Sequence, residues 1–392
     1  MSSILPKKSY LVDFDRILLA TVFVLTVFGI YLQFNIATSM GDNLQMSMFL
    51  NQLRSLFIAI FVFCIVFFIP NLSKLLYHGS FWYLLLVIGL LIYVLLFGIS
   101  EQGSTRWMRL IFFSFQPSQL VHPVLIVFFA KYFERKRHLI ANTGFFGFLN
   151  DFKLLVILTI GIMALILLQP HLSTIIVLSL TLLAMIFVAD FKKSLFFMLI
   201  LIVVGGSLIL INLSHDYRPA RMVTYTKYSL FHKFLGVDQS KIAGCRDRDY
   251  QVVESLTAIT QGGLTGTGSE RGRAKHKFLP DVNSDYIFAM IAEQFGFFGG
   301  FLVILLFSLF LFRAMVIGCS LDSYFNMLVV IGFGVNIFIT AAVNIGVALS
   351  ALPSTGLPLP FVSYGGSALA VNIGMLAVIL NIGSKRRTVN GK

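Results

Sequence analysis

Long apolar segments alternate with short polar ones along the whole chain. Ten of these segments approach the roughly 20 residues that a helix needs to cross the hydrocarbon core of a bilayer. They fall at 16–37, 51–70, 80–99, 118–133, 153–169, 173–189, 194–213, 286–312, 325–348 and 367–383. The pattern predicts an all-α polytopic membrane protein with about ten transmembrane helices, of which the fourth, fifth and sixth are short.

The composition agrees with this prediction, because 57% of the 392 residues are hydrophobic and 12% are charged, against about 25% charged in a soluble domain. With a cytoplasmic amino terminus, the inner tails and short loops hold sixteen Lys and Arg residues, whereas the short outer loops hold Arg54, Arg106 and Arg109. Positive loops resist translocation, so both termini are predicted to be cytoplasmic. We expect the inner cations to contact membrane lipid and not nucleic acid.

These assignments leave one large region outside the membrane. We expect a single membrane domain over 1–392, with cytoplasmic tails at 1–15 and 384–392 and a large extracytoplasmic loop at 214–285, before the eighth span. A loop of this length is too long for a plain connector. Inside it, the apolar residues of 249–260 recur at helical spacing, which predicts an amphipathic helix lying along the outer surface.

Two short motifs follow that helix. The segment Gly262–Gly268 is rich in glycine but lacks the Gly-Lys-Ser/Thr of a phosphate-binding loop, so a nucleotide site is disfavoured. Next, four cations alternate with other residues and would share one face of an extended chain; they are Arg271, Arg273, Lys275 and Lys277. That face would suit a pyrophosphate or lipid head group, and the alternative is a basic loop lying on anionic lipid.

Acidic residues flank the start of the eighth span. Asp281 and Asp285 precede it, and Glu293 lies about two turns inside it. An acid inside a membrane segment is costly to bury, which makes Glu293 a candidate functional residue. Asp285 has two open interpretations, a chemical group at the helix mouth or an N-cap of the helix.

Other polar residues interrupt the spans near their ends. Gln116, Ser118, Gln119 and His122 surround the start of the fourth span, and His171 separates the fifth from the sixth. We expect these five to line a membrane cavity, although His171 has the alternative of a hydrogen-bonded packing residue. Arg106 precedes them in an outer loop whose makeup also fits an interfacial anchor.

Between the last two spans, the segment 353–367 contains three prolines and three glycines before Ser367 and cannot form a regular helix. Irregular backbone near membrane depth must be buried in protein or line a wet cavity, because lipid cannot satisfy its amides. Ser363, Tyr364 and Ser367 supply hydroxyl groups for such a lining.

The chain resembles the SEDS family of bacterial cell-envelope proteins, which comprises FtsW, RodA and SpoVE. The resemblance rests on Pro353-Ser-Thr-Gly-x-Pro-Leu-Pro-Phe-x-Ser-Tyr-Gly-Gly-Ser367, Phe278-Leu-Pro-Asp-x-x-Ser-Asp-Tyr-Ile-Phe-Ala289, Arg106-Trp107 with Gln116-Pro-Ser118, and Tyr217-Arg218-x-x-Arg221. It spans nearly the whole chain and is most like the FtsW branch.

The resemblance implies a glycosyltransferase that polymerises lipid II into the glycan strands of peptidoglycan outside the bacterial cytoplasmic (inner) membrane, in cell division or shape maintenance. It implies a class B penicillin-binding protein and other divisome or elongasome membrane proteins as partners. Asp285 matches the aspartate regarded as catalytic in the family. The chemistry needs a base for the acceptor hydroxyl and positive charge for the leaving pyrophosphate, from Arg106, Arg271, Arg273 or Lys275, with or without a divalent cation such as Mg or Mn.

Several positions depart from the family pattern. The family usually has Glu, Lys and an acid where this chain has Gln119, His122 and His171, and Glu where it has Asp281 and Gln294. These differences keep two alternatives open. One is a lipid II flippase that uses Glu293 and His171 at membrane depth. The other is an inactive scaffold for the penicillin-binding protein.

Overall fold

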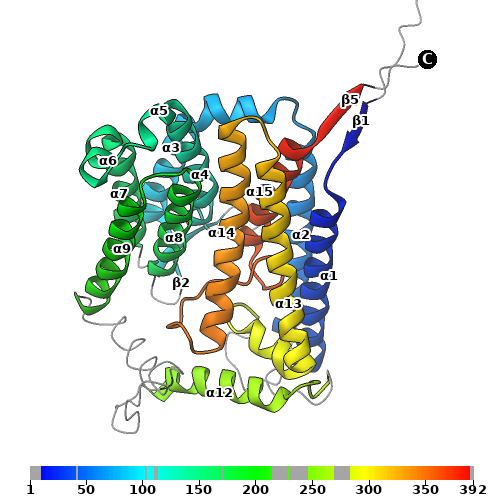
Figure 1. Cartoon of the computed structure of the whole chain (residues 1–392). Helices are drawn as coiled ribbons and strands as arrows, with labels where there is room; N and C mark the ends of the chain where they lie inside the picture. Colours follow the sequence, from blue (N-terminus) through cyan, green and yellow to red (C-terminus); the bar gives the residue numbers. More distant parts are fainter. Residues whose placement is uncertain are drawn as a thin grey trace, which may run out of the picture.

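The protein is a bundle of long helices capped at one end by a helix that lies across it (Figure 1). The computed structural model describes residues 10–40, 43–101, 104–109, 114–169, 171–213, 228, 246–268 and 283–388. Its helices are α1 (Arg16–Met40), α2 (Asn43–Phe68), α3 (Leu72–Phe97), α4 (Ser118–Arg135), α5 (Arg137–Ile140), α6 (Phe145–Asp151), α7 (Lys153–Leu168), α8 (Leu172–Val188), α9 (Lys193–Leu213), α12 (Arg246–Gly262), α13 (Ile287–Cys319), α14 (Tyr324–Ala348) and α15 (Gly366–Gly383).

The predicted all-α membrane fold is confirmed, and each of the ten predicted spans coincides with a helix. Six of these helices are long and apolar enough to cross a membrane by themselves, namely α1, α2, α3, α13, α14 and α15. A seventh span arises if α6 and α7, which are bent by 87° at their junction, are counted as one. The helices α4, α8 and α9 are not among those six, so the total of ten spans stays a prediction.

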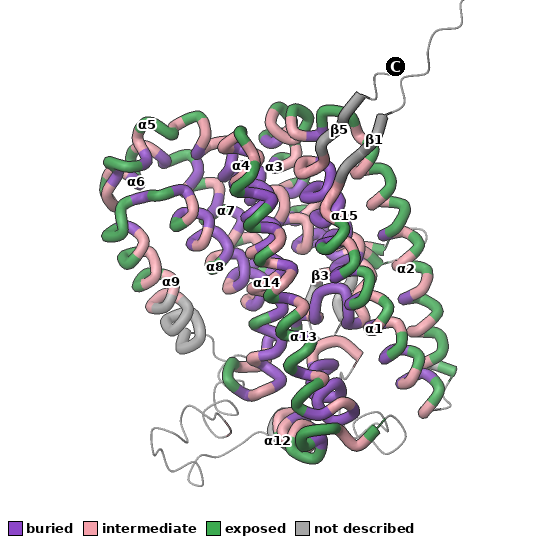
Figure 2. Tube along the Cα trace, turned by 45° about the vertical axis from the view of Figure 1, so that its right-hand side comes forward, coloured by how far each residue is buried: buried purple, intermediate pink, exposed green. Residues whose placement is uncertain are grey.

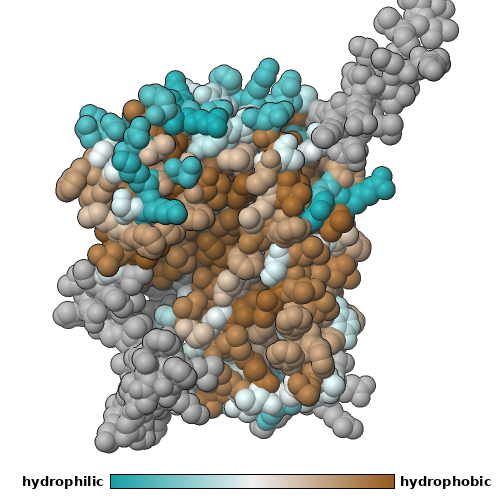
Figure 3. Space-filling model, viewed as in Figure 1, coloured by the Kyte–Doolittle hydropathy of each residue, from teal (hydrophilic) through white to brown (hydrophobic). Residues whose placement is uncertain are grey.

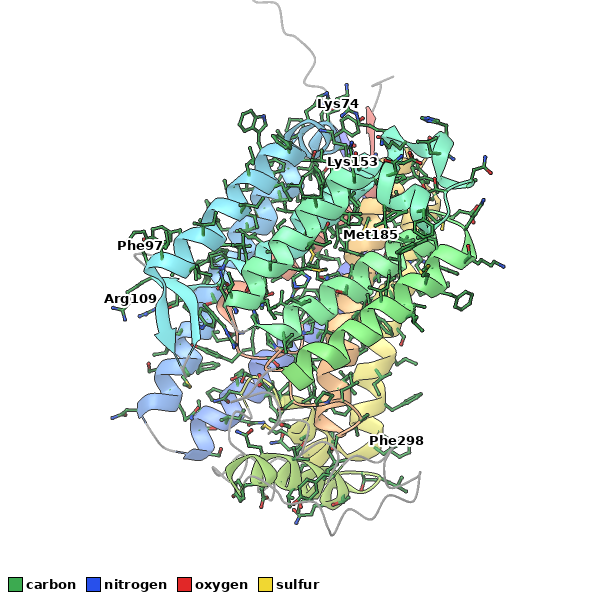
Figure 4. All side chains as sticks on the ribbon, turned by 90° about the vertical axis from the view of Figure 1, so that its left-hand side faces the viewer. Lys74, Phe97, Arg109, Lys153, Met185 and Phe298 are labelled. Atoms are coloured by element: carbon green, nitrogen blue, oxygen red, sulfur yellow. The ribbon has the colours of Figure 1, made fainter. Side chains whose placement is uncertain are left out.

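The two ends of the described chain lie together. Strand β1 (Tyr10–Asp13) pairs antiparallel with β5 (Lys385–Thr388), at the end of the bundle opposite α12 (Figure 1). Lys74 and Lys153 lie at the same end as the termini, whereas Phe298 lies near α12 (Figure 4). This arrangement fits an even number of membrane crossings.

The surface is divided in the way that a membrane requires. Hydrophobic side chains cover the middle of the molecule, and hydrophilic ones gather over the end that carries α5 and α6 (Figure 3). Large side chains such as Phe57, Trp82 and Phe298 are well exposed on this apolar belt. Their exposure is favourable in lipid, where an apolar side chain meets hydrocarbon instead of water.

Helix α14 forms the centre of the bundle. In its most apolar stretch 72% of the residues are buried, against 11% for α2 at the periphery (Figure 2). It packs against α4, α8, α13 and α15. Because α14 is enclosed by protein and not by lipid, its polar residues find protein partners, which makes it the helix around which polar sites are assembled.

A small sheet that the apolar pattern does not predict follows α3. Its strands, in spatial order, are β2 (Ile99–Glu101), β3 (Ser104–Arg109) and β4 (Ser114–Phe115), and both pairings are antiparallel. Arg106 and Trp107 therefore belong to the central strand of this sheet. The strands are too short to show a clear two-residue alternation of polar and apolar positions.

Candidate active site

The Asp285 carboxylate lies on a turn over residues 283–286, immediately before α13. The helix begins at Ile287 and its N-cap position is occupied by Tyr286, whose side chain makes no capping hydrogen bond. Asp285 thus precedes the N-cap by one residue, and the interpretation of Asp285 as the N-cap is wrong. The residue is partly exposed.

The irregular loop between α14 and α15 lies against this carboxylate. A Cβ placed on Gly356 would lie 3.6 Å from Asp285 Oδ2, and Gly356 has a φ of +74°, in the left-handed region that favours glycine. The predicted irregular backbone of 353–367 is confirmed over 353–365, whereas Gly366 and Ser367 already belong to α15. The loop is also largely buried, since Leu359 and Ser363 are 1% and 4% exposed.

Hydrogen bonds fasten the Asp285 turn to this loop. Ser363 Oγ donates to the carbonyl oxygen of Ser284 (2.6 Å), and the Tyr364 amide donates to the carbonyl oxygen of Asn283 (2.8 Å). Ser363 Oγ also accepts a hydrogen bond from the Leu359 amide (2.8 Å). Among the predicted hydroxyl residues, Ser363 therefore acts on the turn through its side chain, whereas Tyr364 acts through its backbone.

Glutamines from α1 and α2 complete this network, and sequence reasoning did not identify them. Gln33 Nε2 donates to the carbonyl oxygen of Asn283 (3.1 Å). Gln52 bridges the loop, because its Nε2 donates to the carbonyl oxygen of Ser363 (3.3 Å) and its Oε1 accepts from the Gly365 amide (3.2 Å). Both glutamines are 4% exposed. In the sequence, the one feature that could have identified them is a polar amide within an otherwise apolar helix.

Glu293 is buried where α13 is broken, a feature that the uninterrupted prediction 286–312 lacked. Gly296 has non-helical dihedral angles (φ 66°, ψ −162°) and divides α13 into two parts. Glu293, three residues earlier, is 1% exposed. Asp285 and Glu293 therefore lie near opposite ends of the short first part of α13, Ile287–Phe295.

The glycine-rich segment after α12 supplies the backbone groups that this break requires. The amides of Thr267 and Gly268 donate to the carbonyl oxygens of Glu293 and Gln294 (2.9 and 3.1 Å). In return, the Phe297 amide donates to a carbonyl oxygen of the segment, that of Gly263 (2.9 Å). The structure thus gives this segment a structural role, and it confirms the helix predicted before it, α12.

Gln119 and His122 line a cavity between α4, α8, α14 and α15, which Leu357 and Pro358 of the irregular loop also line. His122 is 6% exposed. Asn336 Nδ2 lies 3.0 Å from His122 Nδ1 and 3.1 Å from the hydroxyl of a threonine on α8, Thr181. The cavity therefore has polar groups within a partly apolar lining, and it adjoins the same loop that contacts Asp285.

His171 belongs to a second polar cluster, where α4 and α8 begin. Its Nδ1 lies 2.8 Å from Thr174 Oγ1, 3.3 Å from Ser118 Oγ and 3.4 Å from Gln116 Nε2. The backbone amide of Gln116 in turn donates to Ser367 Oγ (3.1 Å). This cluster joins four of the predicted site residues by hydrogen bonds.

The same cluster adjoins both the small sheet and the irregular loop. Arg106 Nε donates to the carbonyl oxygen of Gln169 (3.1 Å), two residues before His171. Ser173 Oγ donates to the carbonyl oxygen of Thr355, next to Gly356. The irregular loop is therefore the element that both polar clusters and the Asp285 turn share.

The remaining predicted residues lie outside the described part of the chain. They are Arg271, Arg273, Lys275 and Asp281, together with Lys277. Among the described residues, no three His, Cys, Asp or Glu side chains are grouped in a way that would hold a metal ion. The described geometry thus places the partly exposed Asp285 on a turn whose backbone is fixed against a buried loop.

Comparisons with known proteins give consistent results. A profile of the FtsW/RodA/SpoVE family, described as cell cycle protein, matches residues 14–388. The chain is 36% identical over 316 residues to a probable peptidoglycan glycosyltransferase FtsW of Saccharophagus degradans, covering 79% of this chain and 77% of the relative. It is 32% identical to stage V sporulation protein E of Bacillus subtilis, covering 94% of this chain and 96% of that protein.

Solved structures share the fold. The crystal structure of the rod shape determining protein RodA of Thermus thermophilus superposes with a TM-score of 0.68 at 22% identity, covering 95% of this chain and 97% of that one. A chain from a peptidoglycan synthase complex that coordinates polymerization and crosslinking gives a TM-score of 0.72 at 22% identity, covering 95% and 98%. The profile match and the extent of these similarities place the chain in the family that its motifs indicated: it belongs to the FtsW/RodA/SpoVE family, the SEDS proteins.

Proposed function

We propose that this chain is a peptidoglycan glycosyltransferase that polymerises lipid II into glycan strands, with Asp285 as the general base. Its relatives named as peptidoglycan glycosyltransferases support the reaction class. The observation that carries the role of Asp285 is its position: a partly exposed carboxylate on a turn held by several backbone hydrogen bonds, 3.6 Å from the Cβ position of Gly356.

Proton transfer is the step that Asp285 performs in this proposal. Its carboxylate accepts the proton of the 4-hydroxyl group of the acceptor sugar while that oxygen attacks the anomeric carbon of the lipid-linked donor. The bond between this carbon and the pyrophosphate oxygen breaks, and the pyrophosphate leaves on its lipid carrier. The rigid mounting of the turn favours such a role, because a base must be held in place before the substrate arrives.

The leaving pyrophosphate needs positive charge. Arg106 is the candidate within the described residues, and it lies at the same end of the bundle as the irregular loop. Arg271, Arg273 and Lys275 remain candidates by sequence. A divalent ion, Mg²⁺ or Mn²⁺, would add charge at the same place, and no step here requires one.

The reaction takes place, in this proposal, on the outer side of the bacterial cytoplasmic membrane. The pairing of β1 with β5 supports a common side for both termini, and the excess of Lys and Arg near that end favours the cytoplasm. Asp285 and α12 then face outwards. The partner proposed for this side is a class B penicillin-binding protein, which crosslinks the strands; the fold match to a chain of a peptidoglycan synthase complex supports this pairing.

The test is polymerisation of lipid II by purified Asp285→Asn protein with its penicillin-binding partner. We expect a loss of at least 100-fold, since general bases contribute typically 10²–10⁴-fold. Asp322→Asn serves as the control, because Asp322 lies in the turn before α14, at the opposite end of the bundle. Normal polymerisation by Asp285→Asn would refute the role of this carboxylate.

A flippase is the second candidate, because α13 is broken beside the buried Glu293, and transporters use broken helices around polar residues. The measurement is translocation of lipid II in proteoliposomes that contain only this protein. Translocation that Glu293→Gln abolishes and Asp285→Asn leaves intact would favour this candidate over the polymerase.

A further inference from the structure

Asn344 is a buried amide near the outer end of the central helix α14. Its exposed fraction is 1%, and its neighbours in sequence, Val343 and Ile345, are apolar and buried. Burying an amide in such surroundings is unfavourable unless it forms hydrogen bonds. A polar residue at this depth therefore needs an explanation in terms of what it holds.

The side chain holds two backbone carbonyl groups. Its Nδ2 donates to the carbonyl oxygen of Asp285 (3.0 Å) and to that of Leu357 (2.7 Å). An NH₂ group has two donors, and each is used. Because both partners are carbonyl oxygens, which can only accept, the nitrogen and not the oxygen of the amide must face them.

These two carbonyl groups lie on either side of the contact between the Asp285 carboxylate and Gly356. One belongs to Asp285 itself, and the other belongs to Leu357, the residue after Gly356. The Asp285 carboxylate lies against Gly356, with Oδ2 3.6 Å from its Cβ position. Asn344 thus fixes both sides of this contact from a third element, the rigid helix behind it.

The remaining atom of the amide is also informative. Asn344 Oδ1 is buried and accepts no hydrogen bond from the residues that the structure describes. The side chain is therefore retained for its two donors and not for its acceptor. Neither an apolar side chain nor an aspartate can replace it, because the first has no donor and the ionised second has only acceptors.

We propose that Asn344 is a positioning residue for the general base: by holding the carbonyl groups of Asp285 and Leu357, it sets the distance between the Asp285 carboxylate and the irregular loop. This inference rests on the proposed role of Asp285 in lipid II polymerisation. Asn344 itself touches no reacting atom and acts only through the backbone of the turn. Its loss should therefore reduce kcat and leave KM for lipid II nearly unchanged.

The first test compares Asn344→Ala with the full-length parent protein, each with its penicillin-binding partner. We expect kcat for lipid II polymerisation to fall 10- to 100-fold, since a displacement of about 1 Å of a catalytic group costs on the order of 100-fold. Asn326→Ala is the matched control, because Asn326 is at the other end of α14 and its side chain is hydrogen-bonded to Ser73. This control should keep the parent kcat.

The second test measures the pH dependence of polymerisation by the isosteric variant Asn344→Asp. A carboxylate offers no donor, whereas a protonated carboxyl group offers one. The rate of Asn344→Asp relative to the parent, measured at each pH from 8 to 5.5, should therefore rise as the pH falls. Dividing by the parent rate removes the pH dependence that the two proteins share. A residue with a merely structural role would give a constant ratio.

Each outcome decides the matter. A parent-like kcat in Asn344→Ala, or a raised KM with unchanged kcat, would overturn the proposal. If the alanine variant does not fold, as judged by thermal unfolding in detergent, the pH ratio of Asn344→Asp decides, and a flat ratio would overturn it. If the proposed role of Asp285 itself is wrong, a different result shows it: Asp285→Asn would polymerise lipid II at the normal rate.

Discussion

Gly266 lies where the glycine-rich segment meets the break in α13. Its φ is +88°, and a Cβ placed there would lie 2.1 Å from the carbonyl oxygen of Gln294, far inside van der Waals contact. Gly266→Ala must therefore move the segment away from α13. Two hydrogen bonds cross at this point, from the amides of Thr267 and Gly268 to the carbonyl oxygens of Glu293 and Gln294. We expect the variant to break both.

The free-energy cost has two parts that a control separates. An alanine at positive φ costs roughly 1–2 kcal/mol, and the two lost hydrogen bonds cost about 1 kcal/mol each. Gly263 also has a positive φ, +54°, but a Cβ there would meet no atom within 4 Å. Gly263→Ala therefore has only the first cost. The two variants should therefore differ by about 2 kcal/mol in the free energy of local opening, which corresponds to about a 30-fold difference in the equilibrium constant for opening the segment.

Hydrogen exchange of the full-length protein in detergent measures this opening directly, because amide exchange reports local free energies. The amides of Thr267 and Gly268 should exchange about 30-fold faster in Gly266→Ala than in Gly263→Ala. Lipid II polymerisation should fall in the first variant as well, because the segment holds the far end of the short helix that follows Asp285. Equal exchange rates in the two variants would refute the reasoning.

Two further substitutions test how the loop and the helices are held. A Cβ on Gly29 of α1 would lie 2.6 Å from the Cα and carbonyl oxygen of Val362. Gly29→Ala should therefore cost about 1–3 kcal/mol of stability by overpacking and lower both the unfolding temperature and the polymerisation rate. The control Gly89→Ala, whose Cβ would meet nothing within 4 Å, should change neither. Asn381 Nδ2 lies within hydrogen-bond distance of the carbonyl oxygens of Val66, Phe67 and Ile69, at and just after the end of α2, and its two hydrogens are shared among them. Asn381→Leu should therefore cost about 1–3 kcal/mol, seen as a lower unfolding midpoint in detergent, and an unchanged midpoint would contradict this account.

The candidate site was only partly predictable. Asp285, Ser363 and the irregular loop were identified from the acid, the hydroxyl groups and the prolines that the segments contain. Gln33, Gln52 and Asn344 were not, although each donates a hydrogen bond to the turn or the loop. A single amide inside an apolar helix gives no indication of its partner, and these partners lie on distant parts of the chain.

Two local features were also predicted incompletely for physical reasons. The eighth span was predicted as one uninterrupted helix because Gly296 lies within a strongly apolar run, and the break is tolerated only because another segment satisfies its backbone. The strands β2, β3 and β4 were missed because two to six residues give too little periodicity.

The sequence by itself determined where the chain enters lipid, where it cannot be helical, and which acid stands at the mouth of the eighth span. These properties are local, because the transfer of a segment into hydrocarbon depends on its own composition. The tertiary structure decided which side chains meet: Asn344 with the Asp285 turn, and the glycine-rich segment with the break in α13. Such contacts depend on the packing of helices that lie far apart in the chain, and inside a membrane every buried backbone group needs a partner that only this packing supplies.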